Sequence, residues 1–309
     1  MDDLHDTPYA GLLDHHTVMD DSQWAFGTDF EDALAGVDTT IPDGVDHEAL
    51  AAYCLMLGDD ALVLSHRLSE WCSHAPDLEE DIALANIALD LLGQARLLSA
   101  RAAAADPAVV PTLPAGSPVP AEDALAFFRT DSGFRNVRLV EAENGDFAVT
   151  IARLLLFSTW RLALLQRLVA SRDQVLSAIA AKAVKEVTYH RDYAGRWFLT
   201  LAQGTDESRS RLLAAVSLVW RLHDELFEPT DTELAIAAAG VGVDPASVAD
   251  EVAEVLAQVF GASAVHRPDL QQVGPVNGGM GRQGRHTEAF SRLLAEMQSV
   301  ARAHPRGLW

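Results

Sequence analysis

The sequence predicts an all-α fold with four long helices as its frame. Apolar residues recur at steps of three and four along most of the chain, which is the spacing of one face of an α-helix. Helix-capping residues, prolines and glycines bound these stretches, and the few β-branched clusters fall inside them. Because 49% of the 309 residues are hydrophobic, the chain has enough apolar side chains for a full core.

The first element is an acidic N-terminal segment, residues 1–45. It is rich in aspartate and contains neither Lys nor Arg, since the first residue of either type is Arg67. This composition is typical of a disordered tail, and we expect one here, followed by a single helical domain over residues 46–309. Trp24 and Phe26 leave a second interpretation open, an arm that becomes ordered on a partner.

Two long helices follow the acidic segment. In the first, an apolar stripe at helical spacing runs from Leu50 to Trp71. The second begins at Asp77, where Glu80 stands three positions later as in a capping box, and it ends near residue 105. The stripe of this second helix consists of Ile82, Leu89, Arg96 and Leu97.

The third helix is apolar nearly all round. A connection rich in proline and glycine, residues 107–122, precedes it, and we place the helix from Asp146 to Ala170. Such a helix is buried on two sides, either by its own domain or by another subunit. We expect another subunit on one side. The side chains of this candidate partner interface are Leu156, Phe157, Trp160, Leu164 and Leu168.

The fourth long helix extends from Asp173 to Gln203, with Glu186 and His190 in the middle of its apolar stripe. A glycine-rich loop at residues 273–284 lies near the end of the chain. Shorter helices are predicted at residues 206–227, 230–239, 245–260 and 287–303.

The charge of the chain disfavours some classes of partner. Acidic residues outnumber basic ones by 45 to 23, so the net charge of −22 repels phosphate backbones and argues against nucleic acid. No apolar run reaches the ~18 residues of a membrane helix, and the acidic N-terminus does not resemble a signal peptide. We therefore expect a cytoplasmic protein with no membrane partner. Cys54 and Cys72 fall in one helical stretch, about 27 Å apart, so they cannot pair with each other.

The glycine-rich loop contains one sequence that looks like a nucleotide-binding motif. Residues 279–284, GMGRQG, match the dinucleotide fingerprint by letter. That motif requires a buried strand before it and a helix after it, whereas the preceding residues are polar and include two prolines. We expect a flexible loop instead, one that presents Arg282 and Arg285 to an anionic partner.

One set of acidic and histidine residues is close to the ligand pattern of a metal site. In a di-iron four-helix bundle, two helices each supply one Glu and the other two each supply Glu-x-x-His. Here Glu186 is followed at the required spacing by Tyr189, and His190 comes one residue later. On the second helix, Asp90 is followed at that spacing by Gly93.

The other two ligand positions are also incomplete. The first helix offers Asp59, Asp60 or Glu70, but the third helix has no carboxylate between Asp146 and Asp173. We therefore expect neither a metal nor a catalytic residue in this chain, although a working metal site stays open as an alternative. Glu186 and His190 are then a buried structural pair, because a charge in an apolar stripe needs a partner. The expected neighbours of this pair are Lys182, Asn86 and Asp90.

The order of several longer motifs resembles one protein family, the β (PaaC-type) subunits of ring-1,2-phenylacetyl-CoA epoxidases. Two motifs, LGDDALVLSHRLSEWC and LANIALDLLGQAR, lie at residues 57–72 and 84–96. Shorter ones follow in the order NGDFA at 144–148, KEVTYH at 185–190, GTD at 204–206, HTE at 286–288 and LAEMQ at 294–298. The resemblance covers residues 46–309, and the acidic extension before it is longer than the family leads us to expect.

This resemblance implies a ferritin-like four-helix bundle with additional C-terminal helices. It implies a subunit that has lost its iron and serves as the structural partner of a homologous di-iron catalytic subunit. The family's complex is a monooxygenase of phenylacetate catabolism that epoxidises the ring of phenylacetyl-CoA with O₂. Its reductase carries flavin and an iron-sulfur cluster and uses NADPH, and small subunits complete it. No cofactor is implied for this chain itself. A di-iron oxidase in its own right and an unrelated helical binding protein are the alternatives.

Overall fold

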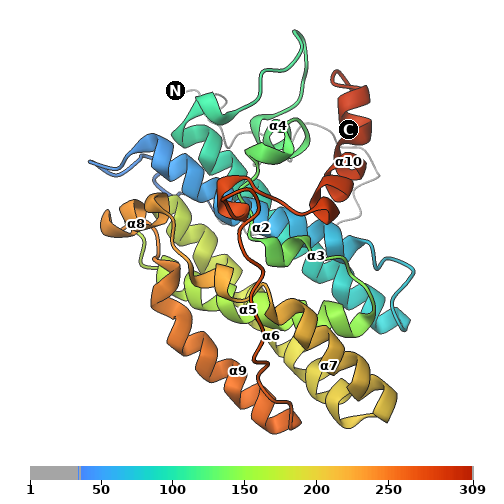
Figure 1. Cartoon of the computed structure of the whole chain (residues 1–309). Coiled ribbons are helices and arrows are strands. Elements are labelled where there is room, and N and C mark those ends of the chain that lie inside the picture. The colour runs from blue at the N-terminus through green and yellow to red at the C-terminus, as the bar shows by residue number, and fades with distance from the viewer. Residues whose placement is uncertain (1–33, 35, 308–309) are drawn as a thin grey trace.

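The protein is all-α, as the sequence predicts. The computed structural model describes residue 34 and residues 36–307 (Figure 1). The four long helices are α2 (His47–Ser69), α3 (Leu78–Ala105), α5 (Phe147–Leu168) and α6 (Gln174–Gln203). Within the described residues β-structure is limited to one isolated bridge, between Val276 and Gly279.

Aspartate caps begin all four long helices. The side chain of Asp46 accepts a hydrogen bond from the backbone N–H of Ala49, and Asp77 accepts one from Glu80. Asp146 and Asp173 cap α5 and α6 in the same way. Each cap satisfies a backbone donor that the first helical turn leaves free. The helix starts expected from the sequence are therefore confirmed within a residue or two.

Six shorter helical elements need separate mention, because some differ from the prediction. They are α4 (Ala121–Phe127), α7 (Asp206–Trp220), α8 (Asp231–Ala238), α9 (Ala249–Ser263), α10 (Glu288–Ala303) and the 3₁₀ turn η5 (Asp224–Phe227). The prediction of one helix over residues 206–227 is wrong, because α7 ends at Trp220 and the turn follows. The prediction of one helix over residues 245–260 is also wrong, because a 3₁₀ turn (Pro245–Val248) precedes α9, and α9 continues to Ser263 before the left-handed Ala264, with φ of 51°.

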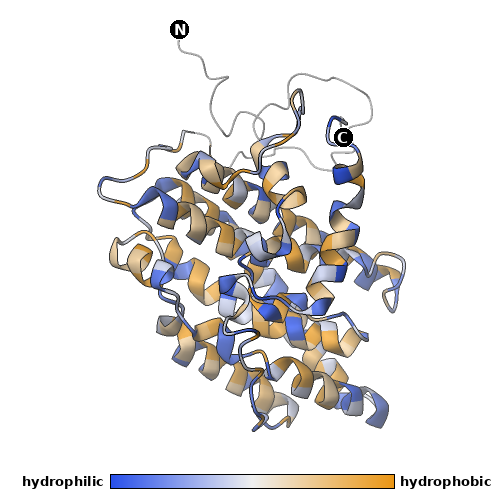
Figure 2. Ribbon diagram, turned by 45° about the horizontal axis from the view of Figure 1, so that its top comes forward, coloured by the Kyte–Doolittle hydropathy of each residue, from blue (hydrophilic) through white to orange (hydrophobic). Residues whose placement is uncertain are grey.

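The long helices form two close pairs, α2 with α3 and α5 with α6. Hydrophobic residues run along most of these helices (Figure 2). At one end of the bundle α4 packs against α10, and α7 and α9 cover α5 on another side (Figure 1). The stripe that contains Ile82 and Leu89 faces solvent. The buried side of α3 consists instead of Leu84, Ile87, Leu91 and Leu98.

The candidate partner interface on α5 lies inside the chain. All five of its residues, Leu156, Phe157, Trp160, Leu164 and Leu168, are at most 5% exposed. The reason is that α6 packs on one side of α5 while α7 and α9 pack on another. The two apolar faces of this helix are thus both covered by its own domain, and the expectation of a partner surface there is wrong.

Among the described residues, three helices are long and apolar enough to span a membrane by length and composition alone: α2, α3 and α5. This corrects the expectation that no segment reaches that length. In α2 and α5, 83% and 94% of the most apolar window is buried inside the protein, whereas in α3 only 44% is buried. For α2 and α5 the apolar composition therefore reflects a place in the core.

The helical domain begins before residue 46. Val45 is buried, and the carbonyl of Thr39 accepts a 2.7 Å hydrogen bond from Nη1 of Arg101. Residues 36–45 therefore belong with the bundle and not with an N-terminal tail. The rest of the predicted disordered tail, residues 1–33 and 35, lies outside the described residues.

Candidate functional site

The residues expected to form a relic metal site lie where α3 faces α6. His190 Nε2 is 3.0 Å from Oδ2 of Asp90, and Nε2 of Gln94 donates a 2.9 Å hydrogen bond to Oε2 of Glu186. Nearer the start of α3, the hydroxyl of Tyr193 donates to Glu80. Polar contacts therefore connect the two helices along their length, with α3 and α6 running in opposite directions.

Glu186 and His190 have separate partners and do not act as one pair. His190 is buried and meets Asp90, one of its expected neighbours. Glu186 is half-buried, and its Oε1 lies 3.8 Å from Nζ of Lys182, a second expected neighbour. Asn86, the third, is exposed on α3. Burial raises the pKa of Glu186, although the hydrogen bond from Gln94 opposes this rise.

An arginine occupies the middle of the bundle beside these residues. Arg161 of α5 is buried, and its Nε and Nη2 lie 3.1 and 3.0 Å from Oε1 of Gln94. Its Nη1 donates a 3.1 Å hydrogen bond to the carbonyl of Leu57 on α2. Burial lowers the pKa of Arg161 to about 10. A chain of hydrogen bonds therefore crosses the bundle from Arg161 through Gln94 to Glu186.

Arg161 and Gln94 are the residues that sequence reasoning missed. The sequence shows that the third helix lacks a carboxylate in its middle, and the structure shows that the guanidinium of Arg161 takes its place. The available signal was an Arg at the centre of an almost wholly apolar helix, where a charge is costly without polar partners.

The carboxylates of α2 are also engaged by arginines. Asp60 binds Arg282 through two contacts, Oδ1 to Nη1 at 3.0 Å and Oδ2 to Nη2 at 2.9 Å. Asp59 binds Arg129 in the same bidentate manner. Glu70, just after the end of α2, accepts a 2.9 Å hydrogen bond from Arg67. Each carboxylate that the first helix offers as a ligand thus has a guanidinium partner.

The glycine-rich loop carries Arg282 into the core rather than to an external anion. Besides Asp60, Nη1 of Arg282 reaches the carbonyls of Met56 at 3.0 Å and Arg135 at 2.8 Å. Burial disfavours its charged form, yet Asp60 and Glu233 raise the pKa of Arg282 above its ordinary value. The expectation for Arg282 is therefore wrong, and Arg285 alone of the two is exposed.

The glycines of the same loop allow close packing of the backbone. A Cβ atom on Gly281 would lie 2.0 Å from the carbonyl oxygen of Asn136, and one on Gly284 would lie 2.4 Å from that of Ser132. Gly284 also has φ of 71°, in the left-handed region that favours glycine. These glycines let the loop fit against residues 132–136, which explains the motif without a nucleotide.

The donor set does not fit a di-iron centre. In the part of the chain that the structure describes, no three His, Cys, Asp or Glu side chains are grouped so that they could hold a metal ion. Gly93 has no side chain, Tyr189 is exposed, and the guanidinium of Arg161 would repel a cation at the centre of the bundle. What this arrangement can do is link three helices through buried hydrogen bonds.

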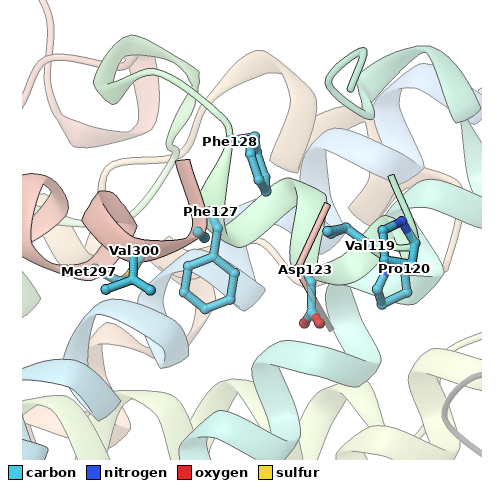
Figure 3. A pocket seen from close by; sticks show the side chains of 10 residues that line it. Val119, Pro120, Asp123, Phe127, Phe128, Met297 and Val300 are labelled. Atoms are coloured by element: carbon cyan, nitrogen blue, oxygen red, sulfur yellow. The ribbon is translucent and has the colours of Figure 1, made fainter. Parts of the chain in front are cut away.

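A separate apolar pocket of about 320 Å³ lies between α4 and α10 (Figure 3). Its walls come from residues 118–128 and from the end of the chain, with Phe127, Met297 and Val300 among them. Asp123 is the charged side chain in this lining, and burial raises its pKa. The pocket offers apolar contact and one carboxyl group, but the lining supplies no base or nucleophile to pair with it.

The geometry of the α3–α6 contact predicts how the two relic residues contribute to stability. Because Glu186 and His190 use different hydrogen-bond partners, we expect most of the losses from Glu186→Leu and His190→Leu to add in a double-mutant cycle. A coupling of about 0.5–1 kcal/mol should remain, since the two residues are one turn apart and the charge of Asp90 acts on both. Glu186→Leu should cost ~1–3 kcal/mol, because it removes the acceptor of the buried amide of Gln94. Urea melts of the four proteins measure both quantities, and recovery in the double variant would contradict separate partners.

Comparison with known proteins adds two findings. The family model described as phenylacetic acid catabolic protein matches residues 37–309. One subunit of the 1,2-phenylacetyl-CoA epoxidase of Escherichia coli (strain K12) is 44% identical to the chain over 262 residues. That match covers 84% of this chain and 99% of the E. coli protein.

Proposed function

We propose a function from one premise: the chain belongs to the phenylacetic acid catabolic protein family. Its E. coli relative is a subunit of an epoxidase, an oxidoreductase complex, and a protein of this kind works together with other subunits. We infer that this chain is likewise a subunit of a phenylacetyl-CoA epoxidase. Its role there is structural, and it stabilises a homologous subunit that carries out the reaction.

One observation carries the structural part of this proposal, the guanidinium of Arg161 in the centre of the bundle. A di-iron centre requires negative and neutral ligands around two cations, but here a fixed positive charge is linked to Gln94 and through it to Glu186. The Glu-x-x-His pattern gives two ligand positions on α3 and two on α6, and both of its histidine positions are replaced, by Gly93 and Tyr189. The polar groups that remain are used for holding helices together.

The partners and cofactors belong to the same proposal. We expect a homologous di-iron catalytic subunit as the direct partner, with small subunits and a reductase that uses NADPH, flavin and an iron-sulfur cluster. The complex would then act in the cytoplasm without nucleic acid or membrane. The net charge of −22 supports the exclusion of nucleic acid.

Iron loading tests the non-catalytic role. We expect the purified chain, incubated with ferrous iron without oxygen and then desalted, to retain no stoichiometric iron and to show no oxidase activity after exposure to O₂. The homologous subunit with intact Glu-x-x-His pairs, treated in the same way, is the positive control. Metal analysis and O₂ consumption are the measurements, and a di-iron complement in this chain would contradict a purely structural role.

A further inference from the structure

In the part of the chain that the structure describes, helix α3 leaves much of its apolar surface uncovered. Only 44% of its most apolar window is buried, about half of the buried share in α2 and α5. The exposed apolar side chains include Leu78 at 68%, Ile82 at 53% and Leu89 at 63%. Large apolar side chains scattered singly are ordinary on a protein surface, but several aligned on one helix indicate an interaction site.

The three exposed residues and two half-buried neighbours follow the spacing of a helix that pairs with another helix. Leu78, Ile82, Ala85, Leu89 and Leu92 are separated by steps of four, three, four and three residues, which is a heptad pattern. Ala85 and Leu92 are half-buried, and Leu92 also packs against the core, so Leu78, Ile82 and Leu89 supply most of the exposed apolar surface of this pattern. We name these five residues the outer stripe of α3. The opposite side of the helix already packs against α2, so the outer stripe is a second apolar face.

Gly93 lies beside the outer stripe, one turn after Leu89, and the described residues give no packing reason for a glycine there. Apart from its two chain neighbours and the backbone of its own helix, no described atom lies within 4 Å of the position that a Cβ would take. A glycine in a helix interior costs about 1 kcal/mol relative to alanine. Close approach of another backbone is a reason to keep a glycine at such a position. Tyr189 of α6, 48% exposed, adds an aromatic surface on the other side of the α3–α6 contact.

We propose that the outer stripe of α3 is the docking surface for a helix of the second, homologous subunit of the complex. The proposal rests on the proposed function, because that function requires such a subunit. The docked helix carries apolar side chains at matching heptad spacing and passes close to Gly93.

Charge defines the partner further. The first turn of α3 bears Glu79 and Asp81 on the two flanks of the outer stripe, so the docked helix needs Lys or Arg next to its apolar face. A second copy of this chain fits less well, since each copy has a net charge of −22 and adds the same carboxylates.

Two variants test the docking surface without disturbing the fold. Ile82→Glu with Leu89→Glu places charges on side chains that already face solvent, so the melting temperature of the isolated chain should stay nearly unchanged. Gly93→Leu should keep or raise it, because a helix interior favours leucine over glycine. Both variants should weaken association with the homologous subunit at least tenfold in Kd, measured by titration calorimetry. The matched control is Leu213→Glu with Leu218→Glu, two exposed leucines of α7.

The outcomes separate this inference from the proposed function. Loss of binding in the outer-stripe variants but not in the α7 control supports the docking surface. If the wild-type chain binds the homologous subunit and the outer-stripe variants bind it equally well, the docking surface is overturned while the proposed function stands. If the wild-type chain does not bind that subunit at all, the proposed function fails and the inference fails with it. A homodimer that the outer-stripe variants dissociate, with the heteromeric complex unaffected, would overturn the proposal and assign the surface to a second copy instead.

Discussion

Asp60→Ala should lower the free energy of unfolding by about 3–5 kcal/mol, the scale for leaving one member of a buried ion pair without its partner. Asp60 is fully buried and holds both terminal nitrogens of Arg282. Its Oδ1 also accepts a 2.8 Å hydrogen bond from the backbone N–H of Val137. The substitution thus removes acceptors from a buried guanidinium and from a buried amide at the same time.

The remaining neighbours of Arg282 do not replace Asp60. Glu233 Oε1 lies 3.6 Å from its Nε, on the other side of the guanidinium, and the carbonyls of Met56 and Arg135 are neutral. We expect Asp60→Leu with Arg282→Met to recover a large part of the loss, because the guanidinium and its main counter-ion leave the core together. Glu233, the other carboxylate beside Arg282, keeps its hydrogen bonds from Thr230. Recovery by the double variant therefore distinguishes an unpaired charge from simple loss of packing.

Urea denaturation of these variants gives the comparison directly. The matched control is Glu207→Gln, which breaks a 2.7 Å ion pair with Arg211 on the exposed surface of α7 and should leave the unfolding midpoint unchanged. A loss below 1 kcal/mol for Asp60→Ala would contradict the importance of this pair and would mean that Arg282 finds solvent or another acceptor. If Asp60→Ala and Glu207→Gln lowered the free energy of unfolding equally, burial would not be the reason for the stabilising effect of the Asp60–Arg282 pair.

Local signals were enough to predict most of the fold. An aspartate followed by an apolar stripe predicts where a helix begins, because a side-chain cap and the first turn are neighbours in sequence. Helix ends were less well predicted. The stretch after Trp220 has helical composition, yet the chain changes there to a 3₁₀ turn in which Glu225 and Leu226 are buried. That change depends on contacts with distant residues, such as the ion pair of Glu225 with Arg138.

The polar centre of the bundle was predicted only in part. Gly93 and Tyr189 are visible as substitutions at fixed spacing from an acidic residue, so the sequence alone indicates an incomplete ligand set. The contact of Arg161 with Gln94 depends on how α5 and α3 are rotated and shifted against each other. No local pattern encodes that register. The same limit explains Arg282, whose partner Asp60 is 222 residues away in sequence.

The two apolar faces of α5 show a further limit of sequence reasoning. Periodicity reveals that both faces are covered but does not say by what, since a helix of the same chain and a helix of a partner present the same apolar side chains. The chain supplies α7 and α9 for this purpose. By contrast, α3 leaves an apolar face uncovered among the described residues, although its heptad stripe resembles a core stripe when only the sequence is considered.

Trp160→Ala should lower the free energy of unfolding by about 3–5 kcal/mol, because it empties the space of a large side chain that the chain buries completely. The indole lies beside Phe157, with ring centroids 5.9 Å apart, and the guanidinium of Arg282 is 5.9 Å from its ring. Trp160→Phe, which keeps an aromatic ring, should cost clearly less. Urea melts measure both losses.

The Trp160→Ala variant also tests whether this face of α5 is part of the core or part of the interface with the homologous subunit. Because Trp160 lies inside the domain, the Trp160→Ala protein, once folded at low temperature, should bind the homologous subunit with the affinity of the wild-type chain. The variant with Ile82→Glu and Leu89→Glu should show the opposite behaviour: it should fold normally and bind poorly. Calorimetric titration at a temperature well below the melting point of each variant makes the affinities comparable. A Trp160→Ala protein that melts like the wild type but fails to bind would restore α5 as the interface, and would require a different arrangement of α7 and α9 in the complex.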